Sequence, residues 1–408
     1  MRSNYKKLGE FIKTVEVRNK DLSASTLLGV SMEKCFIPSV ANTNNVDLSK
    51  YKVVKKNQFA CKLMSVGRDQ KLPVDLLKNH DEAIVSSAYY VFETRDEELL
   101  SSDYLMMWLS RSETDRWVGY VSGGDVRGGI SWDLFCELPI VVPSIQKQNQ
   151  IVSEYKAIVN RIKLNEKVNK KLEATAQAIY KHWFVDFEFP ISAEYAAAIG
   201  KPGLEGKPYK SSGGEMIFCG ELDQEIPKGW CSTYLAKMAN ISAGGDKPKI
   251  YSELINDQCM VPIYSNSTEN QGLYGYTNKA KVMEKSITIS ARGAIIGYTV
   301  LRHQPYVPIV RLIVVCPKHE YFLSYLFQAI CNFTYDSGAS AQGQLTVPEI
   351  ANYKVLEPDQ DTAQLYQNIT EKIYNFVELN KAKNKHLKIL SEAILARMTL
   401  NNREKLAA

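Results

Sequence analysis

Residues 151–183 read IVSEYKAIVNRIKLNEKVNKKLEATAQAIYKHW. Alternating steps of four and three residues pick out one row of positions along this stretch, which is the spacing of a coiled-coil seam. The row consists of Ile151, Tyr155, Ile158, Ile162, Asn165, Asn169, Leu172, Ala176, Ile179 and Trp183. Pro143 precedes the stretch, and proline is tolerated just before a helix or in its first turn. The pattern predicts one helix of about 40 residues, roughly 60 Å long at 1.5 Å per residue.

The chain carries a second copy of this pattern. A shift of 215 residues lays 123–183 on 338–398 without a gap, and Pro358 then falls on Pro143. The second seam consists of Tyr366, Thr370, Ile373, Val377, Asn380, Asn384, Leu387, Ser391, Ile394 and Met398. The shared rhythm and the shared proline predict a second long helix and an internal repeat.

The two helices are predicted to pack on each other as an antiparallel coiled coil. Asn165 and Asn169 lie near the middle of the first helix, and Asn380 and Asn384 near the middle of the second. Antiparallel packing brings these four polar side chains together. Buried asparagine lowers the stability of a seam but fixes its register and direction. In the alternative, the asparagines are solvated on a seam that is only partly closed.

Two larger regions accompany the helices. Both contain short β-type runs between turn signals, such as AIVSSAYYVFETR at 83–95 and VPIVRLIVVCP at 307–317. We expect an α/β fold of the mixed α+β kind, with two globular domains separated by two long helices in a pseudo-twofold internal repeat. Apart from their ends, the two domains hardly resemble each other. The predicted order is domain 1–142, helix 143–188, a Gly/Ser/Lys-rich linker 189–220, domain 221–357 and helix 358–408.

Composition limits the function without deciding it. The chain has 408 residues and a net charge of +5, which neither requires nor excludes a nucleic acid partner. No apolar run reaches the length of a membrane span, and the N-terminus has no apolar signal core. We therefore expect a cytoplasmic protein without a membrane partner. The 8 cysteines are scattered without a C-x-x-C pair, so reduced thiols and no metal site are expected.

Motifs that carry chemistry are missing from the sequence. There is no G-x-x-x-x-G-K-[ST] phosphate loop, no nucleophile elbow, and no Asn-Pro-Pro-aromatic tetrapeptide of a base methyltransferase. The glycines of SAGGDKPK at 242–249 have the wrong spacing for phosphates and indicate a turn. We expect no catalytic residue and no cofactor in this chain.

Several stretches resemble one known family, the specificity (S) subunits of type I restriction–modification systems. The resemblance lies in AQAIYKHWFVDFEFP at 176–190, the long helix before it and the half-length repeat. It extends to SSGGEMIF at 211–218, GELDQEIPKGW at 220–230 and SITISARGAIIGYTV at 286–300. The similarity covers essentially the whole chain. The aromatic stretch and the repeat are its specific parts, whereas the segments inside the domains match loosely.

The resemblance implies a non-catalytic subunit. Each globular domain would be a target-recognition domain that reads one half of a bipartite, asymmetric site in double-stranded DNA, and the helices would set the unread gap. The family assembles with two methyltransferase (M) subunits, which use S-adenosylmethionine to methylate adenine. Two restriction (R) subunits, which use ATP and Mg²⁺, complete the nuclease.

The resemblance also suggests a role for the aromatic cluster at the end of the first helix. Trp183, Phe184 and Phe187 could form part of a docking surface for an M subunit, since aromatic anchors bury well at interfaces. In the alternative, they pack against a domain of the same chain, and the two roles are compatible. The second copy ends ILARMTLNNREKLAA without such a cluster, which favours packing.

Candidate DNA contacts are polar, basic and tyrosine side chains in turn-rich segments, because such groups bind bases and phosphates. In the second domain they are Ser265, Asn266, Tyr274, Tyr276, Arg292 and Gln342. In the first they are Lys62, Arg68, Ser87, Tyr89 and Arg127. Each has an alternative as an ordinary surface or core residue. Two other classes of function stay open, namely a two-headed scaffold that binds no DNA and an enzyme with an unrecognised site.

Overall fold

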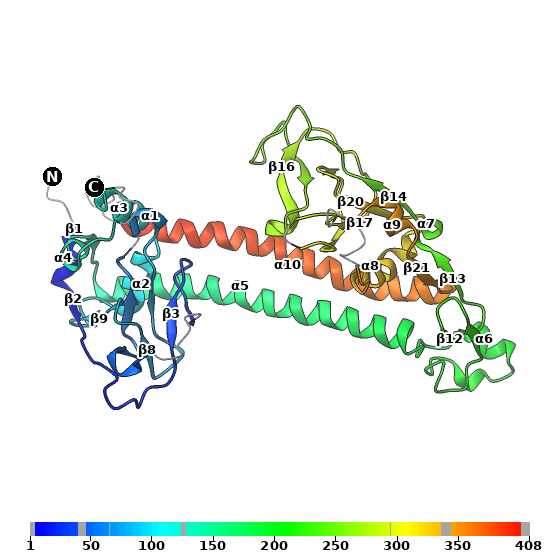
Figure 1. The fold of residues 1–408 in the computed structure, drawn as a ribbon, viewed down its shortest axis with the longest axis horizontal. Coiled ribbons are helices and arrows are strands. Elements are labelled where there is room, and N and C mark those ends of the chain that lie inside the picture. The colour runs from blue at the N-terminus through cyan, green and yellow to red at the C-terminus, as the bar shows by residue number, and fades with distance from the viewer. Residues whose placement is uncertain are drawn as a thin grey trace. The chain divides into compact units, whose positions relative to one another are not determined.

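The computed structural model describes residues 5–39, 46–64, 66–123, 128–293, 295–335 and 344–400. The chain divides into two compact units, Met1–Glu166 with Lys381–Ala408, and Lys167–Asn380. Each unit contains a globular head and part of two long helices, α5 (Ile145–Tyr180) and α10 (Gln360–Leu400) (Figure 1). Neither of these helices, nor any other in the described ranges, is both long and apolar enough to cross a membrane.

The head of the first unit is built on a four-stranded antiparallel sheet of order β2-β9-β6-β7. Its strands are β2 (Ile12–Thr14), β9 (Tyr90–Thr94), β6 (Phe59–Cys61) and β7 (Val74–Leu76). Phe59 lies opposite Phe92, and their rings stack with centroids 4.7 Å apart. Helix α2 (Ser102–Leu109) adds Tyr104 and Trp108 to the same core. The smaller elements are β3 (Leu28–Val30), β4 (Phe36–Pro38), β5 (Lys52–Lys55), β8 (Glu82–Val85), α1 (Val66–Asp69) and α3 (Ser112–Val121).

The head of the second unit has a sheet of equivalent order, β14-β20-β17-β18. Its strands are β14 (Ala239–Ala243), β20 (Ile313–Pro317), β17 (Ser286–Ile289) and β18 (Thr299–Arg302). Helix α8 (Leu323–Cys331) packs into its core, in the position along the chain that α2 has in the first head. A smaller sheet consists of β16 (Leu273–Thr277), β15 (Val261–Tyr264) and β19 (Val307–Pro308).

The internal repeat is confirmed, and its elements begin at the predicted shift of 215 residues. The first copy contains α4 (Trp132–Cys136), β10 (Pro139–Val141) and α5, and the second contains α9 (Val347–Ala351), β21 (Lys354–Glu357) and α10. Strand β10 pairs with β1 (Tyr5–Lys7), and β21 pairs with β13 (Cys231–Tyr234), in both cases antiparallel. The two heads differ in residues but share one sheet topology. The order and pairing of the strands depend on the alternation of apolar and polar residues and on burial. Many different sequences meet these requirements.

Helices α5 and α10 run antiparallel within each unit, as predicted. In the first unit Ile151, near the start of α5, shares a core with Met398, near the end of α10. In the second unit the Tyr366 hydroxyl, near the start of α10, donates to the Ala176 carbonyl at 3.1 Å. Every seam position of both helices is buried or half-buried, whereas Leu164 lies off the seam and is exposed.

The four seam asparagines form two hydrogen-bonded pairs. Asn165 Nδ2 donates to Asn384 Oδ1 at 2.7 Å within the first unit. Asn380 Nδ2 donates to Asn169 Oδ1 at 2.9 Å within the second. All four side chains are buried, so the alternative with solvated asparagines does not occur. That the pairs fix the register of the helices stays a prediction.

Buried polar side chains organise the starts of both long helices. Gln148 is fully buried, and its Nε2 donates to the Pro143 carbonyl at 2.8 Å. At the start of α10, Asp359 accepts hydrogen bonds of 2.8 Å from both the backbone N–H and the hydroxyl of Thr362. The Trp230 indole also donates to Asp359, at 2.8 Å. Asp359 thus caps an N–H group of the first turn of α10 and ties that turn to Trp230, while Gln148 also donates to the Leu99 carbonyl at 2.9 Å and so ties the start of α5 to its head.

The segment 189–220, predicted as a linker, is folded. It contains α6 (Ala193–Ala198) and the first strand of the hairpin formed by β11 (Met216–Cys219) and β12 (Gln224–Pro227). Phe189, Ile191 and Tyr209 are buried in the core of the second unit. The linker prediction is wrong because glycine, serine and lysine dominate the composition, while a few large apolar residues decide the packing.

Short helical turns complete the description. Helix α5 widens at its end into a π-helical turn, η3 (Lys181–Val185), and α7 (Leu235–Met238) connects β13 to β14. The described 3₁₀ turns are Leu8–Glu10, Leu48–Lys50, Pro202–Leu204, Glu269–Gly272 and Glu320–Phe322.

Candidate nucleic-acid interface

A cluster of one lysine and two exposed tyrosines lies beside β16 in the second unit. Lys247 Nζ is 3.7 Å from the ring centroid of Tyr251 and 5.7 Å from that of Tyr274. The polar interaction with the Tyr251 side chain raises the pKa of Lys247, and its ammonium group is charged at neutral pH. We call these three residues the Lys247 cluster. A cation held against exposed rings can contact a phosphate while the rings pack on sugar or base.

Two glycines allow the backbone approaches that position this cluster. A Cβ at Gly244 would lie 2.7 Å from the backbone of β19, and a Cβ at Gly275 would lie 2.6 Å from the Ser252 carbonyl oxygen. Ser252 and Tyr276 exchange two backbone hydrogen bonds of 2.9 and 2.8 Å. The loop after β14 is therefore fixed along β16. The turn expected at SAGGDKPK is the entry to this loop, and it carries Lys247.

Asn266, one of the candidate DNA contacts, holds the turn that carries Arg292. Its Nδ2 donates to the Val310 carbonyl at 2.6 Å, and its Oδ1 accepts from the Ala291 N–H at 2.8 Å. Both ends of the amide are thus engaged within the protein. Arg292 follows Ala291 directly and is exposed. The geometry makes Asn266 a positioning residue and leaves Arg292 accessible to a ligand.

The remaining candidates of the second head lie along β15 and β16. The backbone N–H of Ser265 donates to the Gly272 carbonyl at 2.8 Å, and its hydroxyl is 3.4 Å from the same oxygen, which closes the turn between the strands. Tyr276 is half-buried opposite Pro262, and Tyr274 is exposed. Ser265 is thus next to Asn266 in this turn, and the two tyrosines follow the turn on β16. Gln342 lies outside the described residues.

In the first head, Lys62 and Tyr89 lie at the same end of the β6–β9 pair, because Cys61 is opposite Tyr90. Lys62 is half-buried. The Tyr89 hydroxyl accepts a hydrogen bond from the Val30 N–H at 3.1 Å, so it fastens β3 to the head. Ser87 is exposed on the turn between β8 and β9.

Arg68 is exposed but already paired. Its Nε and one terminal nitrogen lie 2.6 and 3.0 Å from the two carboxylate oxygens of Asp69. A phosphate would have to compete with this carboxylate. Gly67 donates to the Gly128 carbonyl at 2.9 Å, which brings this segment beside the chain that follows residue 127. Arg127 itself lies outside the described residues.

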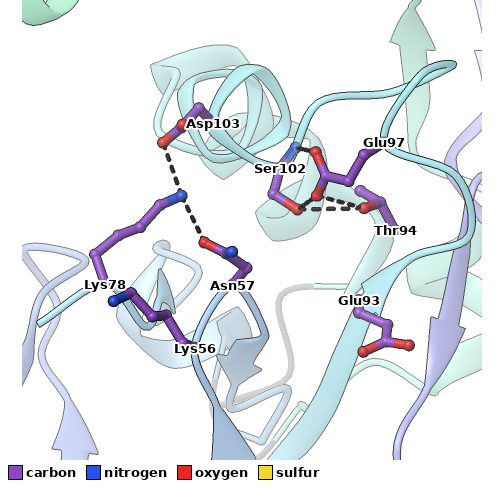
Figure 2. A pocket seen from close by; sticks show the side chains of 8 residues that line it. All are labelled: Lys56, Asn57, Lys78, Glu93, Thr94, Glu97, Ser102 and Asp103. Atoms are coloured by element: carbon purple, nitrogen blue, oxygen red, sulfur yellow. Dashed lines mark hydrogen bonds and ion pairs between the residues drawn. The ribbon is translucent and has the colours of Figure 1, made fainter. Parts of the chain in front are cut away.

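In a polar pocket of about 510 Å³ in the first unit, several of the lining side chains bind one another (Figure 2). Lys78 Nζ lies 3.4 Å from an Asp103 carboxylate oxygen and donates to Asn57 Oδ1 at 2.8 Å. Glu97 accepts from the Ser102 backbone N–H at 3.0 Å and from its hydroxyl. These contacts join the strands to the start of α2. In the ranges that the structure describes, no three His, Cys, Asp or Glu side chains converge as metal ligands would.

The aromatic cluster at the end of α5 lies inside the second unit. Trp183, Phe184 and Phe187 are 8%, 4% and 3% exposed. The Phe184 ring centroid is 4.7 Å from that of Tyr325 and 5.1 Å from that of Tyr366. Phe187 takes a φ of +61°, which turns the chain back after η3. The packing alternative describes these side chains within the second unit, where they have almost no exposed area. Their role as a partner surface stays a prediction.

The family model "Type I restriction modification DNA specificity domain" matches residues 227–389, which include the second sheet and much of α10. A C-terminal type I specificity subunit sequence of Mycoplasma pneumoniae is 36% identical over 107 residues, covering 26% of this chain and 73% of that protein. The chain belongs to the specificity subunits of type I restriction–modification systems.

Other specificity subunits match over different lengths. The HindI specificity subunit of Haemophilus influenzae is 22% identical over 419 residues, covering 88% of this chain and 89% of that subunit. The chain spans 42% of the length of two further M. pneumoniae specificity subunits, at 34% and 33% identity. The solved S subunit from M. genitalium has the same fold, with a TM-score of 0.59, 13% identity and coverage of 97% of this chain and 95% of that one.

Sequence reasoning missed two members of the Lys247 cluster in this specificity subunit. Tyr274 was a candidate, whereas Lys247 and Tyr251 were not. A usable signal was present in the sequence. A Gly-Gly pair permits close backbone approach, and here it is followed within seven residues by a lysine and a tyrosine.

Proposed function

We propose that this specificity subunit reads double-stranded DNA through its two heads, each of which recognises one half of a bipartite, asymmetric site. The observation that supports this most directly is the duplication of the fold. Two heads with one sheet topology, but different residues, each lead into one helix of an antiparallel pair. A split site with unequal halves requires two different readers on equivalent frames, joined by a spacer that fixes the gap.

The chemistry belongs to partner subunits in this proposal. The chain supplies no catalytic group, and two methyltransferase subunits with S-adenosylmethionine modify adenine. Two restriction subunits with ATP and Mg²⁺ complete the complex. The name shared by the relatives, specificity subunit, supports a recognition role.

The test is a map of N6-methyladenine in cells that carry this chain and its methyltransferase subunit. One bipartite motif with a fixed gap is expected, and it should disappear when the chain is deleted. Replacing residues 1–142 by the first head of another specificity subunit should change one half of the motif and leave the other half and the gap unchanged. Absence of any motif, with the methyltransferase active and bound, would contradict the proposal and favour the scaffold. Turnover of a substrate without partners would favour the enzyme.

The Lys247 cluster gives a sharper prediction for DNA contact. Lys247→Ala should weaken DNA binding by the assembled complex about three- to tenfold and lower the salt dependence of binding by about one phosphate contact. The methylated motif should not change, because a phosphate contact carries no base information. Fluorescence anisotropy at several salt concentrations measures both quantities. Lys372→Ala, on an exposed position of α10, is the matched control and should leave both unchanged.

A further inference from the structure

A groove of about 610 Å³ in the second unit has an aromatic floor. Phe189 lies between Tyr209 and Trp230, with ring centroids 4.6 and 4.8 Å apart and interplanar angles of 18° and 19°. Hydrogen bonds hold the outer rings, because Trp230 donates to Asp359 at 2.8 Å and the Tyr209 hydroxyl donates to the Glu215 carbonyl at 3.0 Å. The floor is therefore rigid and apolar, and two of its three rings, Phe189 and Tyr209, lie in the segment predicted as a linker.

The rim of the groove is negatively charged. Glu194, Glu205 and Asp361 line it, and all three are exposed. Lys228 also lines it, but its Nζ is 2.9 Å from both carboxylate oxygens of Glu215, which compensates its charge. The groove is thus acidic on a chain whose net charge is +5. DNA is disfavoured there because its phosphates would be repelled by these carboxylates.

An apolar floor with an acidic rim fits a protein segment that presents a cation among apolar side chains. Leu365, 43% exposed, lies one helical turn after Asp361 and extends the apolar surface of the groove. Arginine and lysine carry long apolar stems that can lie on aromatic rings while their charged ends reach carboxylates. The groove therefore fits a peptide that carries such a side chain. A nucleic acid has no side chain of this kind.

We propose that this groove receives a segment of the methyltransferase subunit that carries a lysine or arginine beside apolar residues. The identity of the partner rests on the proposed function, whereas the chemistry of the segment rests on the groove itself. The buried cluster of Trp183, Phe184 and Phe187 then supports the docking site from within the core, and the contact with the partner is made by the groove outside it.

The first experiment neutralises the rim in the full chain. Glu194→Gln with Glu205→Gln should weaken binding of the methyltransferase subunit of the same system about tenfold and reduce the salt dependence of that binding, because two rim ion pairs are lost. Asp361 is kept, since an acid in the first turn favours the start of α10. The control, Glu225→Gln with Glu284→Gln, changes two exposed carboxylates outside the groove and should have no effect.

A second measurement does not depend on affinity. A photo-reactive benzoylphenylalanine at Leu365 should form a covalent product with the methyltransferase subunit, and the Glu194→Gln with Glu205→Gln background should reduce its yield. Equal affinity of the rim variant and the original chain, or no covalent product from Leu365, overturns the inference while the proposed function stands. If the original chain binds no methyltransferase subunit, the proposed function itself fails, and the assignment of this partner to the groove fails with it. A chain that dimerises alone through the rim carboxylates would assign the groove to a second copy and overturn the partner.

Discussion

Replacing Phe184 by alanine is expected to lower the free energy of unfolding by about 3–5 kcal/mol, which is the range for removing a buried phenylalanine ring. The Phe184 side chain is 4% exposed and contacts rings from three other parts of the second unit. These are Tyr325 on α8, Tyr366 on α10 and Trp230, with centroids 4.7, 5.1 and 5.8 Å from Phe184. Because the surrounding residues belong to different elements, they cannot all close on the cavity. Urea unfolding followed by circular dichroism and tryptophan fluorescence measures the change.

Val185→Ala is the matched control for this prediction. Val185 is the next residue of the same π-helical turn but is 52% exposed, so its truncation should change the stability by no more than about 0.5 kcal/mol. If Phe184→Ala unfolds like Val185→Ala but loses the methyltransferase subunit, the aromatic cluster is a partner surface after all. A large loss of stability, with binding retained by the folded protein, supports packing.

The long helices could be predicted because their signal repeats. Ten seam positions in each copy obey one spacing, and a proline precedes each helix at the equivalent place. In the structure, α5 begins at Ile145 and α10 begins at Gln360. The direction of pairing could be predicted as well, because antiparallel packing gives the seam asparagines partners. Periodicity over many residues averages out local exceptions.

The common topology of the heads could not be predicted. Their strands are 3 to 5 residues long in the main sheets, which is too short for a residue pattern to identify equivalent strands. Strand β6 and strand β17 occupy equivalent places in the two sheet orders, yet one reads FAC and the other SITI. Both strands are fully buried, and packing does not require that their residues be alike.

The candidate DNA contacts were predictable only as regions. Residue type marked Asn266 and Tyr89 as candidate DNA contacts, which they remain, but it did not show that both also form hydrogen bonds to the backbone of their own heads. Lys247 was missed because its role depends on Tyr251 and Tyr274, and Tyr274 is brought to it by strand pairing far along the chain. Whether a polar side chain is free for a ligand is decided by its neighbours in space, which local sequence does not give.

The second large effect is expected at the seam asparagines. Asn165→Leu should lower the free energy of unfolding by about 1–3 kcal/mol, because it leaves the buried carbonyl of Asn384 without the donor now 2.7 Å away. Asn384→Leu should do the same by removing the acceptor of the Asn165 amide. The double change should be near neutral or stabilising, since two apolar side chains then face each other on the seam.

A double-mutant cycle on this pair therefore predicts a coupling free energy of about 2 kcal/mol or more, measured by urea unfolding of the full chain. Asn375→Leu, at an exposed position of α10, controls for the general effect of leucine on a helix and should change the stability by no more than about 0.5 kcal/mol. The informative variant is the stable double one. If the asparagines fix the register, it should fold well, and in the proposed complex the methyltransferase subunits should modify sites with more than one gap length. The reason is that no polar pair at this position then penalises a shifted seam. A double variant that retains a single gap would show that the heads, or the remaining Asn169–Asn380 pair, set the spacing without this contact.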